Sequence, residues 1–287
     1  MTALSPRVPA PTTRRLAALV WLALVGCEPR ADSAQPQPQP TAPAPTPAPA
    51  EPEAPPQTDP LGPDYLPEVA GVHYLEFVTG DADPESELVM IVAIHGLGDR
   101  PESFASLLRE FKRPARVIVP RALDANEPGW SWFPIRARDP DVEGLAKGIV
   151  RAADTLAPAI AELVELRPTK GKPIVTGFSQ GGMLSFTLAV RHGELFSAAY
   201  PVGGWLPPPL WPTAKAKPDA PPIVAFHGDE DKAVALEPTQ LAVDELKRQG
   251  YAVDFHVYVG VGHKIVPEMF KDLMLELRGA VDRVAAE

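Results

Sequence analysis

The strongest constraint on the fold is an uninterrupted apolar run at residues 88–94, Leu-Val-Met-Ile-Val-Ala-Ile. A strand with one face toward water alternates apolar and polar residues, whereas a strand covered on both faces is apolar throughout. The run therefore predicts a central strand of a sheet that is buried on both sides.

Strand and helix patterns alternate from residue 65 onward. Further strands are predicted at residues 72–79, 115–119, 173–176, 197–202, 223–226 and 253–259, and helices at residues 102–111, 141–166, 180–192, 236–249 and 265–285. Pro158 is expected to kink or break the second helix. This alternation predicts an α/β domain over residues 65–287, with a mostly parallel central sheet and helices on both faces. Ligands of such sheets bind beyond the carboxyl ends of the strands.

The start of the chain has the pattern of a targeting signal. Arginines precede a ten-residue apolar run at residues 16–25, which is too short for a bilayer-spanning helix of about 20 residues. The run leads into Leu-Val-Gly-Cys, which resembles a bacterial lipobox, and Cys27 is the only cysteine in the chain. We therefore expect residues 1–26 to be a lipoprotein signal peptide and Cys27 to carry the lipid. An ordinary signal peptide is the alternative.

A proline-rich segment separates this signal from the expected domain. Residues 36–63 contain 12 prolines in 28 residues. Such a composition buries too little apolar surface to fold and favours an extended, solvated chain. We expect residues 27–64 to be a disordered spacer between a membrane anchor and the domain. Glu28, rather than aspartate, follows the cysteine, which by resemblance to lipoprotein sorting favours the outer membrane.

A candidate nucleophile lies between a predicted strand and a predicted helix. Residues 177–182 read Gly-Phe-Ser-Gln-Gly-Gly, which matches the G-x-S-x-G nucleophile elbow. Side chains at positions 177 and 181 would collide with the neighbouring strand and helix. The helix N-terminus offers amide donors to developing negative charge. The context predicts that Ser179 is a nucleophile, and a serine that caps the helix is the alternative.

A serine nucleophile needs a base, and in this arrangement an acid and then a histidine follow it in the chain. Three histidines follow the predicted helix: His227, His256 and His263. His227 precedes every plausible acid in its loop, and His256 lies inside a strand. His263 lies at the carboxyl end of that strand and is the predicted base. Asp229 and Asp231 both qualify by position as the acid.

Five motifs occur in a shared order: residues 95–99 (His-Gly-Leu-Gly-Asp), 131–133 (Ser-Trp-Phe), 177–182, 227–234 (His-Gly-Asp-Glu-Asp-Lys-Ala-Val) and 262–263 (Gly-His). With these motifs, residues 88–287 resemble the phospholipase/carboxylesterase group of the α/β-hydrolase fold, which includes acyl-protein thioesterases. The resemblance implies that Asp231 completes the triad with Ser179 and His263. It also implies an oxyanion hole formed by the backbone amides of Leu97 and Gln180.

Four of the five tryptophans fall in two loops near the expected site. From these loops, Trp130, Trp132, Phe133 and Trp205 are candidate lining residues of an acyl or aryl pocket. The alternative is that they pack the loops onto the domain.

The expected function is therefore a serine carboxylic ester hydrolase that acts through an acyl-enzyme on a small-molecule or lipid-like ester. A catalytically inactive, surface-tethered binding module is one alternative, and a peptidase or acyltransferase on the same fold is another. The sequence contains no metal-ligand cluster or phosphate-binding loop, so no cofactor or metal is expected. The net charge of −10 disfavours nucleic acid as a partner.

Overall fold

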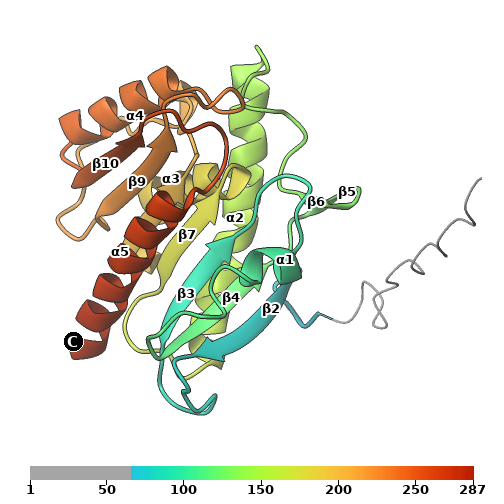
Figure 1. Ribbon diagram of the computed structural model, residues 1–287, viewed down its shortest axis with the longest axis vertical. Helices are drawn as coiled ribbons and strands as arrows, with labels where there is room; N and C mark the ends of the chain where they lie inside the picture. Colours follow the sequence, from blue (N-terminus) through green and yellow to red (C-terminus); the bar gives the residue numbers. More distant parts are fainter. Residues whose placement is uncertain (1–65) are drawn as a thin grey trace, which may run out of the picture. The chain divides into compact units, whose positions relative to one another are not determined.

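Eight strands form the central sheet of the computed structural model, which describes residues 66–287 (Figure 1). The spatial order is β1 (Glu68–Val69), β2 (Val72–Thr79), β4 (Ala115–Pro120), β3 (Val89–Ile94), β7 (Ile174–Phe178), β8 (Ala198–Val202), β9 (Ile223–Gly228) and β10 (Val253–Tyr258). Within this sheet β4, β3, β7, β8, β9 and β10 are parallel to one another. The antiparallel pairs are β1 with β2 and β2 with β4. The predicted mostly parallel sheet is confirmed. The expected signal peptide, Cys27 and spacer lie outside the described residues.

Helices cover both faces of the sheet, as predicted. The helices are α1 (Pro101–Ala105), α2 (Val142–Leu166), α3 (Gln180–Arg191), α4 (Leu236–Arg248) and α5 (Pro267–Ala286). Buried residues of α2, α3 and α4 join one apolar cluster, and those of α1 and α5 join another. The sheet is therefore the middle layer between two cores.

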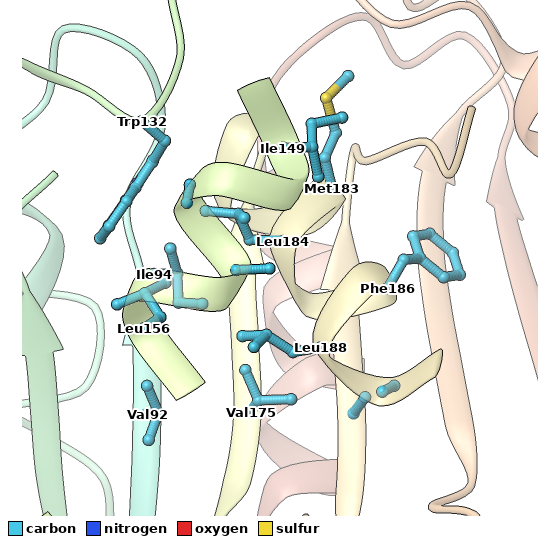
Figure 2. Packing of buried hydrophobic residues seen from close by; sticks show 14 of the residues in the cluster. Val92, Ile94, Trp132, Ile149, Leu156, Val175, Met183, Leu184, Phe186 and Leu188 are labelled. Carbon is cyan, nitrogen blue, oxygen red and sulfur yellow. The ribbon is translucent and has the colours of Figure 1, made fainter. Parts of the chain in front are cut away.

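Strand β3 shows why residues 88–94 are apolar without a break. Val89, Ile91 and Ala93 point into the cluster that α5 covers. Met90, Val92 and Ile94 belong to the opposite cluster, where Figure 2 shows Val92 and Ile94 near residues of α2 and α3. Each of the larger side chains, the valines, isoleucines and Met90, stabilises the fold by about 1.5–3 kcal/mol on full burial. A polar residue on either face of this strand would lose that contribution.

Two predicted helices differ from the structure. The first helix ends at Ala105 instead of continuing to residue 111, because the following amides bond three residues back, as from Leu108 to the Ala105 carbonyl. Helix α2 continues through Pro158 without a break. Its first turn is capped by the Asp141 carboxylate, which accepts from the Gly144 amide at 2.8 Å.

A short hairpin of β5 (Asp124–Asn126) and β6 (Gly129–Ser131) was not predicted from the sequence. It leads directly into residues 131–133, which lie beside the candidate site. None of the helices within residues 66–287 is both long and apolar enough to cross a membrane.

Candidate active site

Ser179 occupies the turn between β7 and α3 in a backbone conformation that non-glycine residues rarely adopt. Its φ is 59° and its ψ is −114°, and its amide donates to the Val202 carbonyl at 2.9 Å. Such conformations cost on the order of 1–3 kcal/mol and persist where the surroundings impose them. The turn places the hydroxyl at the carboxyl end of the sheet.

Two glycines make this turn possible, as the sequence predicted. A Cβ on Gly177 would lie 2.6 Å from the backbone of Gly181 and from the Ile94 carbonyl. A Cβ on Gly181 would overlap the same Ile94 carbonyl. Because the obstructing atoms are backbone atoms of β3 and α3, no side-chain adjustment relieves these contacts.

His263 lies between the serine and an aspartate. Its Nε2 lies 2.8 Å from Ser179 Oγ, and its Nδ1 lies 2.6 Å from Asp231 Oδ2. The imidazole packs on Phe178, with ring centroids 4.8 Å apart. The structure therefore brings the three sequence-predicted residues into one hydrogen-bonded chain. In this chain Ser179 Oγ can give up its proton to Nε2.

The Asp231 carboxylate is buried at the end of β9. Its other oxygen, Oδ1, accepts from the amides of Ala233 and Val234 at 2.9 and 2.8 Å. Burial opposes ionisation, but the hydrogen bonds from His263 and these amides outweigh it, so the pKa of Asp231 lies below its ordinary value. The carboxylate stays charged at neutral pH and can stabilise an imidazolium on His263.

The neighbouring Asp229 has a different role. Its carboxylate accepts from the Gly260 amide at 2.7 Å, so it ties the loop after β9 to the loop after β10. His227 is buried, and its Nε2 lies 2.9 Å from the Val234 carbonyl. Both residues shape the loop that presents Asp231.

A glycine turn after β3 lies against the elbow. A Cβ on Gly96 would lie 3.4 Å from the Cβ of Ser179, which shows how closely the two segments approach. The Gln180 amide is in the first turn of α3, where amides have no intrahelical partner. Leu97, which follows Gly96, and Gln180 therefore lie next to the Ser179 turn, where their backbone amides are the expected oxyanion donors.

A cavity of about 390 Å³ opens at Ser179 and His263. Its wall is mainly apolar, and two arginines stand among the lining residues, which are Gly96, Leu97, Asp99, Phe133, Ile135, Arg136, Ala137, Arg138, Phe178, Ser179, Gln180, Met183, Ala233, Val234 and His263. Leu97, Gln180 and the serine–histidine pair thus line one space that an ester can enter.

The structure corrects most of the expected pocket lining. Phe133 lines the cavity, but Trp130, Trp132 and Trp205 do not. Trp132 and Trp205 are buried in the core, and Trp130 stacks against the guanidinium of Arg121 at 4.1 Å. These three tryptophans therefore pack the loops onto the domain, which was the alternative hypothesis for them.

Several residues of the site were missed by the sequence reasoning. The segment after Phe133 supplies part of the wall, and the side chain of Gln180 bonds to residues 131–133. No spacing rule identifies a wall residue, whereas the Ser-Trp-Phe motif was a signal that residues 131–133 matter. The described residues contain no cluster of His, Cys, Asp or Glu able to hold a metal ion.

Comparison with known proteins identifies the family. Residues 74–278 match the phospholipase/carboxylesterase family. A curated relative, acyl-protein thioesterase 1 of Gibberella zeae, is 28% identical over 210 residues, which cover 66% of this chain and 88% of the relative.

Solved structures show the same fold. The esterase PE8 structure has a TM-score of 0.64 at 22% identity, and covers 73% of this chain and 99% of its own. Zea mays acyl-protein thioesterase 2 has a TM-score of 0.55 at 26% identity, and covers 72% of this chain and 99% of its own. The architecture described above is thus that of an α/β-hydrolase.

Proposed function

Because this chain belongs to the phospholipase/carboxylesterase family, we propose that it is a serine carboxylic ester hydrolase that acts through an acyl-enzyme on Ser179. The observation that carries the proposal is the chain of hydrogen bonds from Asp231 through His263 to Ser179 at the floor of a cavity. The relatives named as thioesterases and carboxylesterases support cleavage of acyl bonds.

The reaction follows from the positions of these groups. Ser179 Oγ attacks the ester carbonyl while its proton passes to His263 Nε2, and Asp231 stabilises the imidazolium. The developing oxyanion accepts from the amides of Leu97 and Gln180. Collapse of the tetrahedral intermediate expels the alcohol, which takes the proton from His263. A water molecule then attacks the acyl-enzyme by the same steps and releases the acid.

The cavity wall indicates the kind of substrate. Phe133, Ile135 and Met183 offer an apolar surface to an acyl or aryl group. Arg136 and Arg138 are exposed at the same cavity, and no residue within 66–287 forms an ion pair with either. We therefore propose small-molecule or lipid-like esters as substrates, and a panel of p-nitrophenyl esters with and without a terminal carboxylate tests the contribution of the two arginines.

The test of the function is active-site labelling combined with turnover. A fluorophosphonate should form a phosphorus–oxygen bond at Ser179 with loss of fluoride. Ser179→Ala should lose labelling and about 10⁶-fold in kcat, as found when a nucleophilic serine is removed from a complete triad. Its circular dichroism and melting temperature should match those of the wild type. Undiminished turnover in the folded variant would refute the assignment and favour a binding module.

The cellular location rests on the sequence alone. We propose that the protein is exported and anchored to the bacterial envelope through lipid on Cys27, in the outer membrane as residue 28 suggests. Several acyl chains on one cysteine hold a protein firmly at a membrane, whereas one chain holds it marginally. Mass spectrometry of the N-terminal peptide from cells should show a lipidated start at Cys27. An unmodified cysteine or another start would refute the anchor.

A further inference from the structure

One short segment contacts the surroundings of both proposed oxyanion donors. Residues 131–133, called the bridge below, join the end of β6 to the cavity wall. We propose that the bridge and His95 are positioning elements that fix the separation and direction of the Leu97 and Gln180 amides. The proposal rests on the ester-hydrolase function above. It assigns a role to the Ser-Trp-Phe motif at residues 131–133, which contributes no residue to the triad.

The bridge holds Gln180 through its side chain. The Trp132 amide donates to Gln180 Oε1 at 2.9 Å, and Gln180 Nε2 donates to the Phe133 carbonyl at 2.8 Å. The Gln180 carboxamide thus accepts one hydrogen bond from the bridge backbone and donates another to it. These two bonds determine which position of the carboxamide is oxygen and which is nitrogen. Ser131 Oγ also donates to the Phe133 carbonyl at 2.8 Å. Since Gln180 is only 5% exposed, these bonds anchor the first residue of α3 and its amide.

The bridge holds the Leu97 turn from the other side. The indole Nε1 of Trp132 donates to the His95 carbonyl at 3.0 Å. The residue before the bridge, Trp130, accepts from the Gly98 amide at 2.8 Å. Leu97 therefore lies between two points of attachment to residues 130–132. A displacement of this segment moves both donors, because the same backbone contacts Gln180.

His95 acts on the Leu97 amide through the intervening peptide. The Ala122 amide donates to His95 Nε2 at 3.2 Å, so Nε2 is the acceptor and Nδ1 carries the proton. Nδ1 donates to the Gly96 carbonyl at 2.8 Å, and that carbonyl belongs to the same peptide group as the Leu97 N–H. A hydrogen bond to the carbonyl polarises the N–H of its own amide and strengthens it as a donor.

The burial and hydrogen bonding of His95 keep its imidazole in one protonation state and one tautomer. Its side chain is fully buried, and this burial lowers its pKa despite the opposing effects of the Gly96 carbonyl and Asp99. The imidazole is therefore neutral at pH 7, and the bond from Ala122 selects one tautomer. The donor to the Gly96 carbonyl is therefore present at neutral pH.

Positioning of this kind predicts a distinct kinetic effect. Oxyanion donors stabilise the transition state only when they lie about 2.7–3.1 Å from the oxyanion. The ground-state ester depends on the cavity wall instead. Loosening the bridge should therefore lower kcat and leave KM nearly unchanged.

The test uses substitutions that delete hydrogen bonds and keep a large apolar side chain in place. Trp132→Phe removes the indole N–H, and Gln180→Met removes the carboxamide while keeping the backbone amide. Trp211→Phe is the matched control, since its Nε1 donates to the Leu206 carbonyl at 2.8 Å and it does not line the cavity. We would measure kcat and KM for p-nitrophenyl butyrate and Ki for an arylboronic acid. The boronate bonds to Ser179 Oγ, whose proton passes to His263, and it carries negative charge as the transition state does.

In Trp132→Phe, kcat should fall about tenfold and Ki should rise by the same factor, below the 10²–10³ lost when an oxyanion donor is deleted. KM should change less than about twofold, and Trp211→Phe should change none of the three. Unchanged kcat and Ki in folded Trp132→Phe and Gln180→Met would overturn the proposal, as would an equal loss in Trp211→Phe. A wild type that neither turns over esters nor binds the boronate would instead overturn the proposed function itself.

Discussion

The two halves of the site beside Ser179 are built in different ways. On the β9–β10 side, the proposed acid and base, Asp231 and His263, reach Ser179 through a chain of side-chain hydrogen bonds. On the β3–β6 side, the proposed donors are backbone amides, and the buried side chains of His95, Trp132 and Gln180 make the hydrogen bonds around them. In the proposed mechanism, one half depends on the chemical identity of two ionisable side chains, whereas the other depends on the position of two backbone amides.

The largest difference in kcat is expected from substitution of the proposed catalytic acid, Asp231. Asp231→Asn should lower kcat by about 10⁴, because the amide cannot hold His263 in the tautomer that accepts the serine proton. Asp229→Asn should keep activity within about threefold, since the asparagine oxygen can still accept from the Gly260 amide and nothing else is lost. Steady-state kinetics on the two purified variants, matched by melting temperature, provide the measurement. A larger loss of kcat in Asp229→Asn than in Asp231→Asn would mean that Asp229, and not Asp231, is the acid of the triad.

The first half could be predicted from the sequence because its chemistry constrains residue type and order. A glycine-flanked serine after a strand, an aspartate after another and a histidine after the last are each visible as residues. The parallel sheet then places all three at one edge. Only the choice between Asp229 and Asp231 needed the family resemblance, since both follow β9 at similar distances.

The second half could not be predicted because its components act through geometry. The bond from His95 Nδ1 to the Gly96 carbonyl and the pairing of the Gln180 carboxamide depend on side-chain direction, which no periodic pattern encodes. The tryptophans show the same limit. The sequence placed Trp132 and Trp205 in loops near the site, but burial and hydrogen bonding turn both rings into the core instead of the cavity.

A pH titration of stability tests whether both halves keep a buried neutral histidine. Burial lowers the pKa of His95 in one half and of His227 in the other, whereas in the unfolded chain both titrate near 6.5. The unfolded state therefore binds more protons below about pH 6.5, and stability should fall as pH decreases. Each histidine contributes up to about 1.4 kcal/mol per pH unit.

Urea unfolding between about pH 5 and pH 8 measures this slope. Above about pH 7 both states hold neutral histidines and the two groups add no dependence. Asp231 affects stability in a separate, more acidic pH range. Because its pKa in the folded state is depressed, its contribution to stability is complete above the ordinary carboxyl pKa of 3.8 and is lost only at lower pH. Replacing His95 or His227 with glutamine should each remove part of the slope. A flat profile in the wild type would show that the histidines are protonated in the folded state.

The smallest effect is expected at Trp205, and it sharpens the contrast with Trp132. Trp205 is 7% exposed, and its Nε1 is buried without a hydrogen-bond partner among the described residues. Trp205→Phe removes that unsatisfied N–H, whose burial costs about 1–3 kcal/mol, and loses packing of similar size. The free energy of unfolding should therefore change by less than about 1 kcal/mol, with kcat and KM within about twofold. Because the same substitution at Trp132 deletes a satisfied donor to the His95 carbonyl, its effect should be on kcat. Equal losses of kcat at the two positions would show that the loop after β8 also positions the catalytic groups, and that the division into two halves is wrong.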